Sequence, residues 1–217
     1  MNYLKAFIFA LICFANFSIY ASDASVSTIF LKRHSGKSYD PSKKVTISQM
    51  KALMEAARWT PSSHNDQPWY FLFCERDLTP EAYNKVFSTL KDTQKAWVQN
   101  APLLVVVIMR SKEIHNGKQN YWGDYDAGAA AISMALQAVD LDLMAHQVGG
   151  CDKAKLTELF ALPENHKIMT VMVVGHELSA EPDLKAYPRI RRPIEETFFL
   201  GEWGAGFPQG LLDSESG

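Results

Sequence analysis

Two long apolar segments constrain the fold of this chain of 217 residues more than any other feature of its sequence. Residues 102–109 read PLLVVVIM and residues 168–175 read IMTVMVVG, and both are rich in β-branched side chains without regular polar positions. A strand with this pattern is typically buried on both of its faces. Each strand therefore needs helices above and below it, which favours a sheet enclosed between two layers of helices.

The remaining segments supply helices and shorter strands in alternation. Apolar residues at three-and-four spacing predict amphipathic helices, and short runs of aromatic and aliphatic residues predict further strands. Helices are expected over residues 46–59, 79–100, 124–139 and 153–160, with a short one from Val26, and strands over residues 69–74 and 142–148. This alternating order predicts one α/β sandwich domain.

The first 24 residues have the organisation of a secretory leader. Lys5 precedes an apolar run over residues 6–17, and small or polar residues follow it. About a dozen apolar residues are fewer than the roughly 20 that a permanent membrane helix needs. We therefore expect residues 1–24 to be a signal peptide, residues 25–200 to form the domain, and the Gly-rich residues 201–217 to form a C-terminal tail.

The leader predicts a periplasmic or secreted protein, or a cytoplasmic one if it is not functional. The alternative is an apolar N-terminal helix that is retained for packing or for a dimer contact. After cleavage Cys74 and Cys151 would be the cysteines of the mature protein. The sequence leaves open whether they form a disulfide, because spatial proximity cannot be read from it.

Charge and ligand spacing exclude several classes of partner. Twenty-two Lys and Arg against 24 Asp and Glu give a formal net charge of −2, so no basic field attracts nucleic acid. The six histidines include no pair at i,i+4, and the sequence contains no CxxC. We therefore expect no metal site and no nucleic-acid partner.

Four polar segments are candidates for a binding site. RHSGKS at residues 33–38 combines cations, a hydroxyl and a glycine, which suits a phosphate. TPSSHNDQPW at residues 60–69 is rich in neutral amides and hydroxyls, which suit the edge of a heteroaromatic ring. HQVGGC at residues 146–151 contains a glycine pair that permits close approach to a flat ligand, and RIRRP at residues 189–193 is the densest positive patch. Each segment taken alone is also compatible with a turn or a solvated surface.

Taken in order, RHSGKSYD, ARWTPSSHNDQPWYF, LMAHQVGGCD and RIRRPIEE resemble segments of the nitroreductase family of flavoproteins. The resemblance runs from about Ser27 to about Glu196, and Pro-Ser-Ser-x-Asn-x-Gln-Pro-Trp is its most specific part. It implies an α+β fold built as a three-layer α/β/α sandwich. It further implies a homodimer formed through long interface helices, with two FMN sites across the subunit interface.

The resemblance assigns contacts with FMN to particular residues. The first segment would hold the phosphate, the ribityl chain and the pyrimidine edge, and the second would reach the flavin mostly from the opposite subunit. The third would lie beside the flavin ring, and the fourth would grip the phosphate. The expected cofactor-binding residues are Arg33, His34, Ser35, Lys37, Pro61, Ser62, Ser63, Asn65, Gln147, Gly149, Gly150, Arg189, Arg191 and Arg192. No catalytic side chain is expected, because the flavin itself carries the chemistry.

The function that the resemblance implies is FMN-dependent oxidoreduction. NAD(P)H would reduce the flavin, and a nitroaromatic, a quinone or a similar planar acceptor would take the electrons in a ping-pong cycle. No GxGxxG motif is present, so NAD(P)H is expected to bind over the flavin and not at a Rossmann site. The alternatives are a non-catalytic exported flavin-binding protein and a specialised flavin dehydrogenase or dehalogenase with a different donor.

A lid over the ligand is expected from residues 83–120. The aromatic residues in and next to this segment would either stack on a ligand ring or pack in the core. These residues are Phe87, Trp97, Tyr121 and Trp122. The sequence does not identify the substrate, and it does not discriminate between NADH and NADPH.

Overall fold

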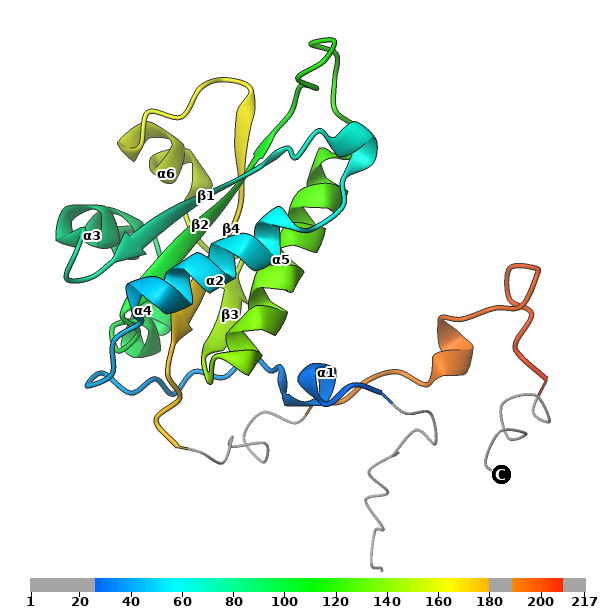
Figure 1. Ribbon diagram of the computed structural model, residues 1–217, viewed down its shortest axis with the longest axis horizontal. Coiled ribbons are helices and arrows are strands. Elements are labelled where there is room, and N and C mark those ends of the chain that lie inside the picture. The colour runs from blue at the N-terminus through cyan, green and yellow to red at the C-terminus, as the bar shows by residue number, and fades with distance from the viewer. Residues whose placement is uncertain (1–25, 180–188, 209–217) are drawn as a thin grey trace, which may run out of the picture.

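The computed structural model describes residues 26–179 and 189–208. Its elements follow the expected order along the chain (Figure 1). The strands are β1 (Trp69–Glu75), β2 (Leu103–Arg110), β3 (Met144–Val148) and β4 (His166–Gly175). The α-helices are α1 (Thr28–Lys32), α2 (Ile47–Arg58), α3 (Pro80–Ser88), α4 (Asp92–Val98), α5 (Gly123–Asp140) and α6 (Lys153–Leu159), and the 3-10 helices are η1 (Ser63–Asn65) and η2 (Ile194–Glu196).

The four strands form one sheet in the order β1-β2-β4-β3, and all three neighbouring pairs are antiparallel. The two central strands are the two apolar segments that the sequence analysis singled out. Every residue of β2 is buried, which confirms that this strand is covered on both faces. The pairing of β2 with β4 has one irregularity, between Val107 and Ile108.

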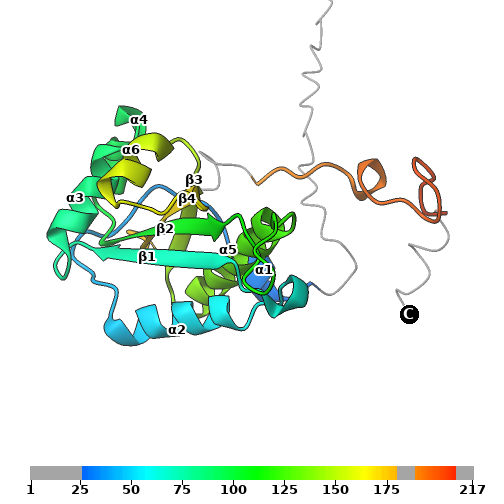
Figure 2. The ribbon, with the colours of Figure 1, turned by 90° about the horizontal axis from the view of Figure 1, so that it is seen from above.

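Helices cover both faces of the sheet and complete the expected three layers. Alternate residues of β2 enter two separate cores, with Leu104 and Val106 in one and Leu103 and Val105 in the other. The first core packs against α3, α4 and α6, and the second packs against α2 and α5. Figure 2 shows these two groups of helices on opposite sides of the strands. The expected α+β three-layer sandwich is therefore confirmed.

Helix α2 begins at a capping box, as its sequence favours. The backbone N–H of Gln49 donates to Thr46 Oγ1 (3.1 Å), and the backbone N–H of Thr46 donates to Gln49 Oε1 (2.9 Å). The Gln49 amide also donates to the Leu141 carbonyl (3.3 Å), just beyond the end of α5. Two of the helices of one layer are thus joined at this end of the sandwich.

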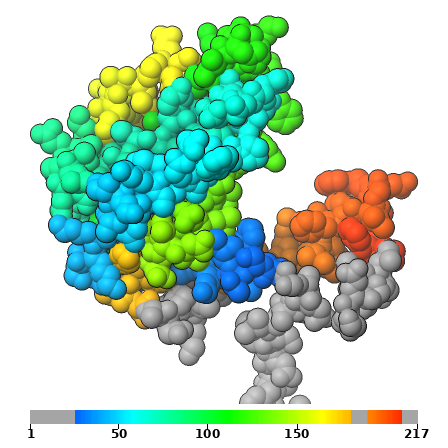
Figure 3. Space-filling model, in the orientation of Figure 1, coloured from blue at the N-terminus to red at the C-terminus, as the bar shows by residue number. Residues whose placement is uncertain are grey.

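Residues 189–208, named here the C-terminal arm, extend away from the sandwich beyond α1 (Figures 1 and 3). The arm carries η2 and exposes a series of large apolar side chains. These are Ile190, Ile194, Phe198, Leu200 and Trp203. Trp203 is 94% exposed, which is unfavourable for an isolated chain in water and typical of a surface that another protein covers.

The expected signal peptide at residues 1–24 lies outside the described residues, as do residues 209–217 of the expected tail. Within the described residues, no helix has both the length and the apolar character that crossing a bilayer requires.

Candidate functional site

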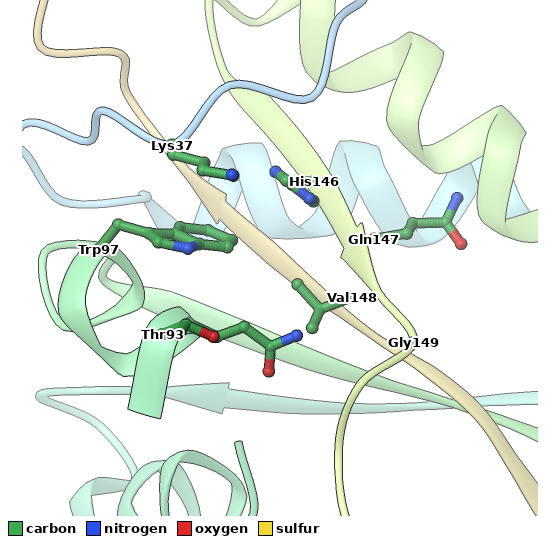
Figure 4. Close-up of a pocket in the computed structure, with 8 residues that line it drawn as sticks. Lys37, Thr93, Trp97, His146, Gln147, Val148 and Gly149 are labelled. Carbon is green, nitrogen blue, oxygen red and sulfur yellow. The ribbon is translucent and has the colours of Figure 1, made fainter. Parts of the chain in front are cut away.

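A pocket of about 340 Å³ lies between the end of β3, helix α4 and the segment that follows α1. This volume is within the range of small-molecule sites. Its lining combines one cation, one imidazole and several neutral donors, namely Lys37, Thr93, Gln94, Trp97, His146, Gln147, Val148 and Gly149. Figure 4 shows Lys37, Trp97 and His146 facing one another, with the side chain of Gln147 directed to the other side of β3.

The segment of residues 33–37 is held against the sheet by two histidines. His34 Nε2 lies 3.0 Å from Glu177 Oε1, and His34 Nδ1 lies 2.9 Å from the Lys32 carbonyl oxygen. His146 Nδ1 lies 2.8 Å from the carbonyl oxygen of Gly36. A Cβ at position 36 would lie 2.4 Å from Met144 Sδ, so glycine permits this close approach to β3.

Three arginines, Arg33, Arg189 and Arg191, gather beside α1, and within residues 26–179 and 189–208 none of them forms an ion pair with a carboxylate. Arg189 donates to the carbonyl oxygens of Phe30 (3.1 Å) and Leu31. Burial, followed by repulsion from Arg189 and Arg191, lowers the pKa of Arg33, and burial together with Arg191 lowers the pKa of Arg189. An anion placed among these cations would relieve their repulsion.

The remaining residues of the two basic segments are distributed as follows. Ser35 Oγ lies 3.5 Å from Arg33 Nη1, so this hydroxyl belongs to the arginine group. Arg192 is exposed on the same segment as Arg191. The Nε of Arg189 is buried and has no hydrogen-bond partner in the described part of the chain. A buried donor of this kind is what a phosphate oxygen satisfies.

Residues 61–67, named here the 61–67 loop, connect α2 to β1 and contain η1. His64, Asn65 and Gln67 have positive φ angles of 53°, 54° and 44°, so the backbone turns in an unfavourable conformation. Two carboxylates hold it in place. Asp126 accepts from the backbone N–H of Ser63 (3.1 Å), and Asp66 forms a buried ion pair with Arg110 (2.8 Å).

Within the same loop, Ser62 Oγ accepts from the backbone N–H of Gln67 (3.0 Å). The backbone N–H of Asn65 donates to the Ser62 carbonyl (3.0 Å), and Pro61 precedes this turn. The side chain of Asn65 is exposed, and those of Ser62 and Ser63 are half-buried. The turn thus presents hydroxyl and amide groups at the surface next to α5.

Within one chain, the 61–67 loop lies away from the pocket. Trp69, which follows the loop, pairs with Met109 at one end of β2. His146 of the pocket pairs with Val173, which pairs with Leu104 near the other end. Met109 lies five positions after Leu104 along β2, or about 17 Å away at ~3.3 Å per residue. Within one chain, the candidate residues of the 61–67 loop are therefore separated from the candidate residues of the pocket.

The pocket brings together Lys37, Gln147 and Gly149 from the expected set, and it adds residues that were not in that set. Thr93 and Gln94 come from α4, which lies within the expected lid of residues 83–120, although neither residue was singled out there. Gln94 Oε1 accepts from the backbone N–H of Lys91 (3.1 Å), which leaves its amide N–H groups as the donors. The Gln94 amide nitrogen lies against Gly150, where a Cβ would approach it to 2.7 Å.

The four aromatic candidates have different environments. Trp97 lines the pocket, whereas Phe87 packs against the core that α3 covers. Tyr121 and Trp122 are 86% and 56% exposed at the start of α5. Only Trp97 among these four is therefore placed to face a ligand in the pocket.

Cysteine and metal chemistry have no support in the geometry of the described residues. Cys74 and Cys151 are free thiols, and burial raises the pKa of Cys74 to about 12 and also raises that of Cys151. Neither thiol is activated as a nucleophile. Across residues 26–179 and 189–208, no three side chains of His, Cys, Asp or Glu are grouped as a metal site.

Comparison with known proteins gives a consistent result. The profile of the nitroreductase family matches residues 30–176. The major NAD(P)H-flavin oxidoreductase of Aliivibrio fischeri is 40% identical over 206 residues, which cover 77% of this chain and 94% of that protein. The oxygen-insensitive NAD(P)H nitroreductase of Enterobacter cloacae is 26% identical over 218 residues, which cover 78% of this chain and 96% of that protein.

Solved structures share the same fold. An oxidoreductase containing FMN superposes with a TM-score of 0.76 at 30% identity, over 85% of this chain and 96% of that one. An Exiguobacterium sibiricum protein in complex with FMN superposes with a TM-score of 0.65 at 18% identity, over 81% of this chain and 96% of that one. The likeness therefore extends over nearly the full length of both of these structures.

Proposed function

The chain belongs to the nitroreductase family, and we infer that it is an FMN-dependent oxidoreductase that takes electrons from NAD(P)H. The observation that carries this inference is the neighbouring presence of a donor-lined pocket at Lys37 and an arginine cluster at α1. The acceptor we propose is a nitroaromatic, a quinone or a similar planar molecule. Bound FMN supplies the hydride and electron chemistry, and the protein supplies binding and orientation.

The residues present fit FMN. Arg33, Arg189 and Arg191 form a cation cluster in which burial, followed by mutual repulsion, lowers the pKa values of Arg33 and Arg189. The buried Nε of Arg189 has no hydrogen-bond acceptor within the described residues. Both features suit the phosphate. The pocket donors Lys37 and Gln94 suit the carbonyl oxygens and ring nitrogens at the edge of an isoalloxazine.

We propose distinct roles for the pocket residues. The Lys37 ammonium stabilises negative charge at the pyrimidine side of the site, because it is the one cation among the described residues that line the pocket. The Gln94 amide, oriented by Lys91, donates to a carbonyl-type acceptor. Trp97 supplies a ring face and excludes water from one wall. Gly149 leaves open space, since a Cβ there would meet no atom within 4 Å.

We also propose that the active form is a homodimer in which a second copy completes each site. Pro61, Ser62, Ser63 and Asn65 lie far from the pocket of their own chain, so they are available to the pocket of a partner. The exposed apolar side chains of the C-terminal arm supply a surface for the same contact. Phe30 on α1 and Ile132 on α5 are exposed as well and extend it toward the long helix.

We propose, as a separate matter, that the protein acts outside the cytoplasm. The support is the charged, apolar and small-residue order of residues 1–24. Mass measurement of the protein purified from its native host tests this, since removal of the leader would shorten the N-terminus. An intact N-terminus in a cytoplasmic fraction would overturn it.

The absorption spectrum of the purified protein tests the cofactor, and anaerobic addition of NADPH or NADH tests the donor. We expect bound FMN that bleaches with at least one of the two. Lys37→Ala should weaken FMN binding, whereas Lys167→Ala, which removes a surface lysine paired with Asp124 (2.7 Å), should not. A chain that binds no added FMN would refute the function. A bound flavin that neither nucleotide bleaches would refute the proposed donor.

A further inference from the structure

The side chain of His146 is fixed between two neighbours at the inner wall of the pocket. Its ring stacks on Trp97, with centroids 4.8 Å apart, and Trp97 stacks in turn on Tyr39 at 6.1 Å. Its Nδ1 lies 2.8 Å from the Gly36 carbonyl oxygen. The stack and the hydrogen bond together leave the imidazole one orientation.

This contact determines which ring nitrogen carries the proton. A carbonyl oxygen only accepts, so Nδ1 donates and is protonated in the neutral ring. Burial lowers the pKa of His146, the bond to Gly36 partly opposes that effect, and Lys37 and Arg33 lower it further. The α4 residues that line this pocket, Thr93, Gln94 and Trp97, are uncharged. The ring is therefore neutral near pH 7.

His146 holds the carbonyl of Gly36, which is the residue just before Lys37. On its other side, the segment is attached to the end of β4 through His34 and Glu177 (3.0 Å). Gly36 itself packs closely against the Met144 side chain, since a Cβ there would lie 2.4 Å from Met144 Sδ. The Gly36 carbonyl thus connects the His146 side chain of β3 to the peptide that leads into Lys37. The side chains of Lys37 and His146 face each other in the pocket (Figure 4).

We propose that His146 is a positioning residue, which places the ammonium of Lys37 at the cofactor by donating a hydrogen bond to the Gly36 carbonyl. The proposal rests on the FMN-dependent function given above. It makes the affinity for FMN and its midpoint potential depend on an N–H donor at residue 146. It assigns His146 no contact with the cofactor and no proton transfer.

Two substitutions isolate the donor. His146→Asn and His146→Leu both remove the imidazole and its stack on Trp97. Their side chains have the same branching, but only the asparagine places an N–H near the position of Nδ1. We expect His146→Leu to bind FMN about threefold to tenfold more weakly than His146→Asn, the range for one hydrogen bond. The midpoint potential of the leucine variant should shift in the direction that Lys37→Ala shifts it, and the asparagine variant should stay near the wild type.

A double-mutant cycle tests whether His146 acts through Lys37. In a Lys37→Ala background, exchanging Asn for Leu at residue 146 should no longer change the FMN dissociation constant or the potential. Thermal unfolding of the FMN-free variants controls for global damage. If the leucine variant does not fold, His146→Gln replaces it, because that amide reaches the Nε2 position and not Nδ1.

Equal affinities and potentials for the asparagine and leucine variants would overturn the positioning role. The same conclusion would follow if the difference between them persisted without Lys37. These outcomes require a wild type that binds FMN, so they are distinct from failure of the proposed function, in which the wild type itself binds none.

Discussion

Removal of the Asp66 carboxylate should destabilise the domain more than removal of any exposed carboxylate. Its Oδ2 accepts from Arg110 Nη2 (2.8 Å) and from the Asn120 amide (2.9 Å), and its Oδ1 accepts from the Ile114 backbone N–H (2.8 Å). The side chains of Asp66 and Arg110 are only 3% and 7% exposed. Asp66→Ala therefore leaves a buried guanidinium without its counter-charge.

The expected magnitude follows from these contacts. Breaking a buried ion pair by removing one partner costs about 3–5 kcal/mol, and each of the two neutral donors left behind adds about 1 kcal/mol. Arg110 keeps the Lys112 carbonyl as an acceptor, which reduces the loss. We expect a decrease of about 5 kcal/mol in the free energy of unfolding, the low end of this sum. For a domain of this size, that corresponds to a melting temperature lower by about 10–20 °C.

Urea unfolding at pH 7, followed by calorimetry, measures this difference. Asp124→Ala is the matched control, since Asp124 pairs with Lys167 at 2.7 Å but on the surface, where an ion pair contributes about 0–1 kcal/mol. Adding Arg110→Met to Asp66→Ala should restore part of the stability, because no charge then remains buried. A loss for Asp66→Ala that is no larger than for the control would refute the reasoning.

Three further outcomes are expected. Thr46→Ala removes the N-cap of α2 and should cost about 1 kcal/mol in urea unfolding, whereas an unchanged midpoint would mean that the cap is dispensable. Burial lowers the pKa values of His146 and His166, so the folded state binds fewer protons than the unfolded chain. Stability should therefore be constant above about pH 6.5 and decrease as the pH falls below it, and a flat urea midpoint between pH 5 and 8 would contradict this. Phe198→Asp combined with Trp203→Asp should weaken the proposed dimer, which sedimentation at several concentrations would detect as a lower mass.

The pattern of apolar residues predicts the elements of this fold but not the direction of its strands. Val105 and Val173 are buried whichever way their strands run, because burial depends on the helices above and below. Alternation of helices and strands is typical of parallel sheets, yet every pair here is antiparallel. The direction of each strand depends on where the connecting helices α3, α4 and α5 leave the chain before the next strand begins. A local pattern of apolar residues carries no information about that position.

The residues of the candidate site were likewise only partly predictable from the sequence. Lys37, Gln147 and Gly149 were expected together because glycine and cation motifs carry a resemblance that can be recognised. Thr93 and Gln94 were not, since polar residues on a short amphipathic helix look the same whether they face water or a pocket. The assignment of these motifs to FMN contacts stays a prediction until binding is measured.

The place of β4 in the sheet also has a consequence for how the chain is made. This strand lies between β2 and β3, although it is the last of the described strands to be synthesised. Until it emerges, β2 has one unpaired backbone edge and a continuous surface of valine, leucine and isoleucine. Such edges template association with other chains. Nascent or partly unfolded molecules are therefore expected to aggregate through β2, and the arrival of β4 is the step that ends that risk.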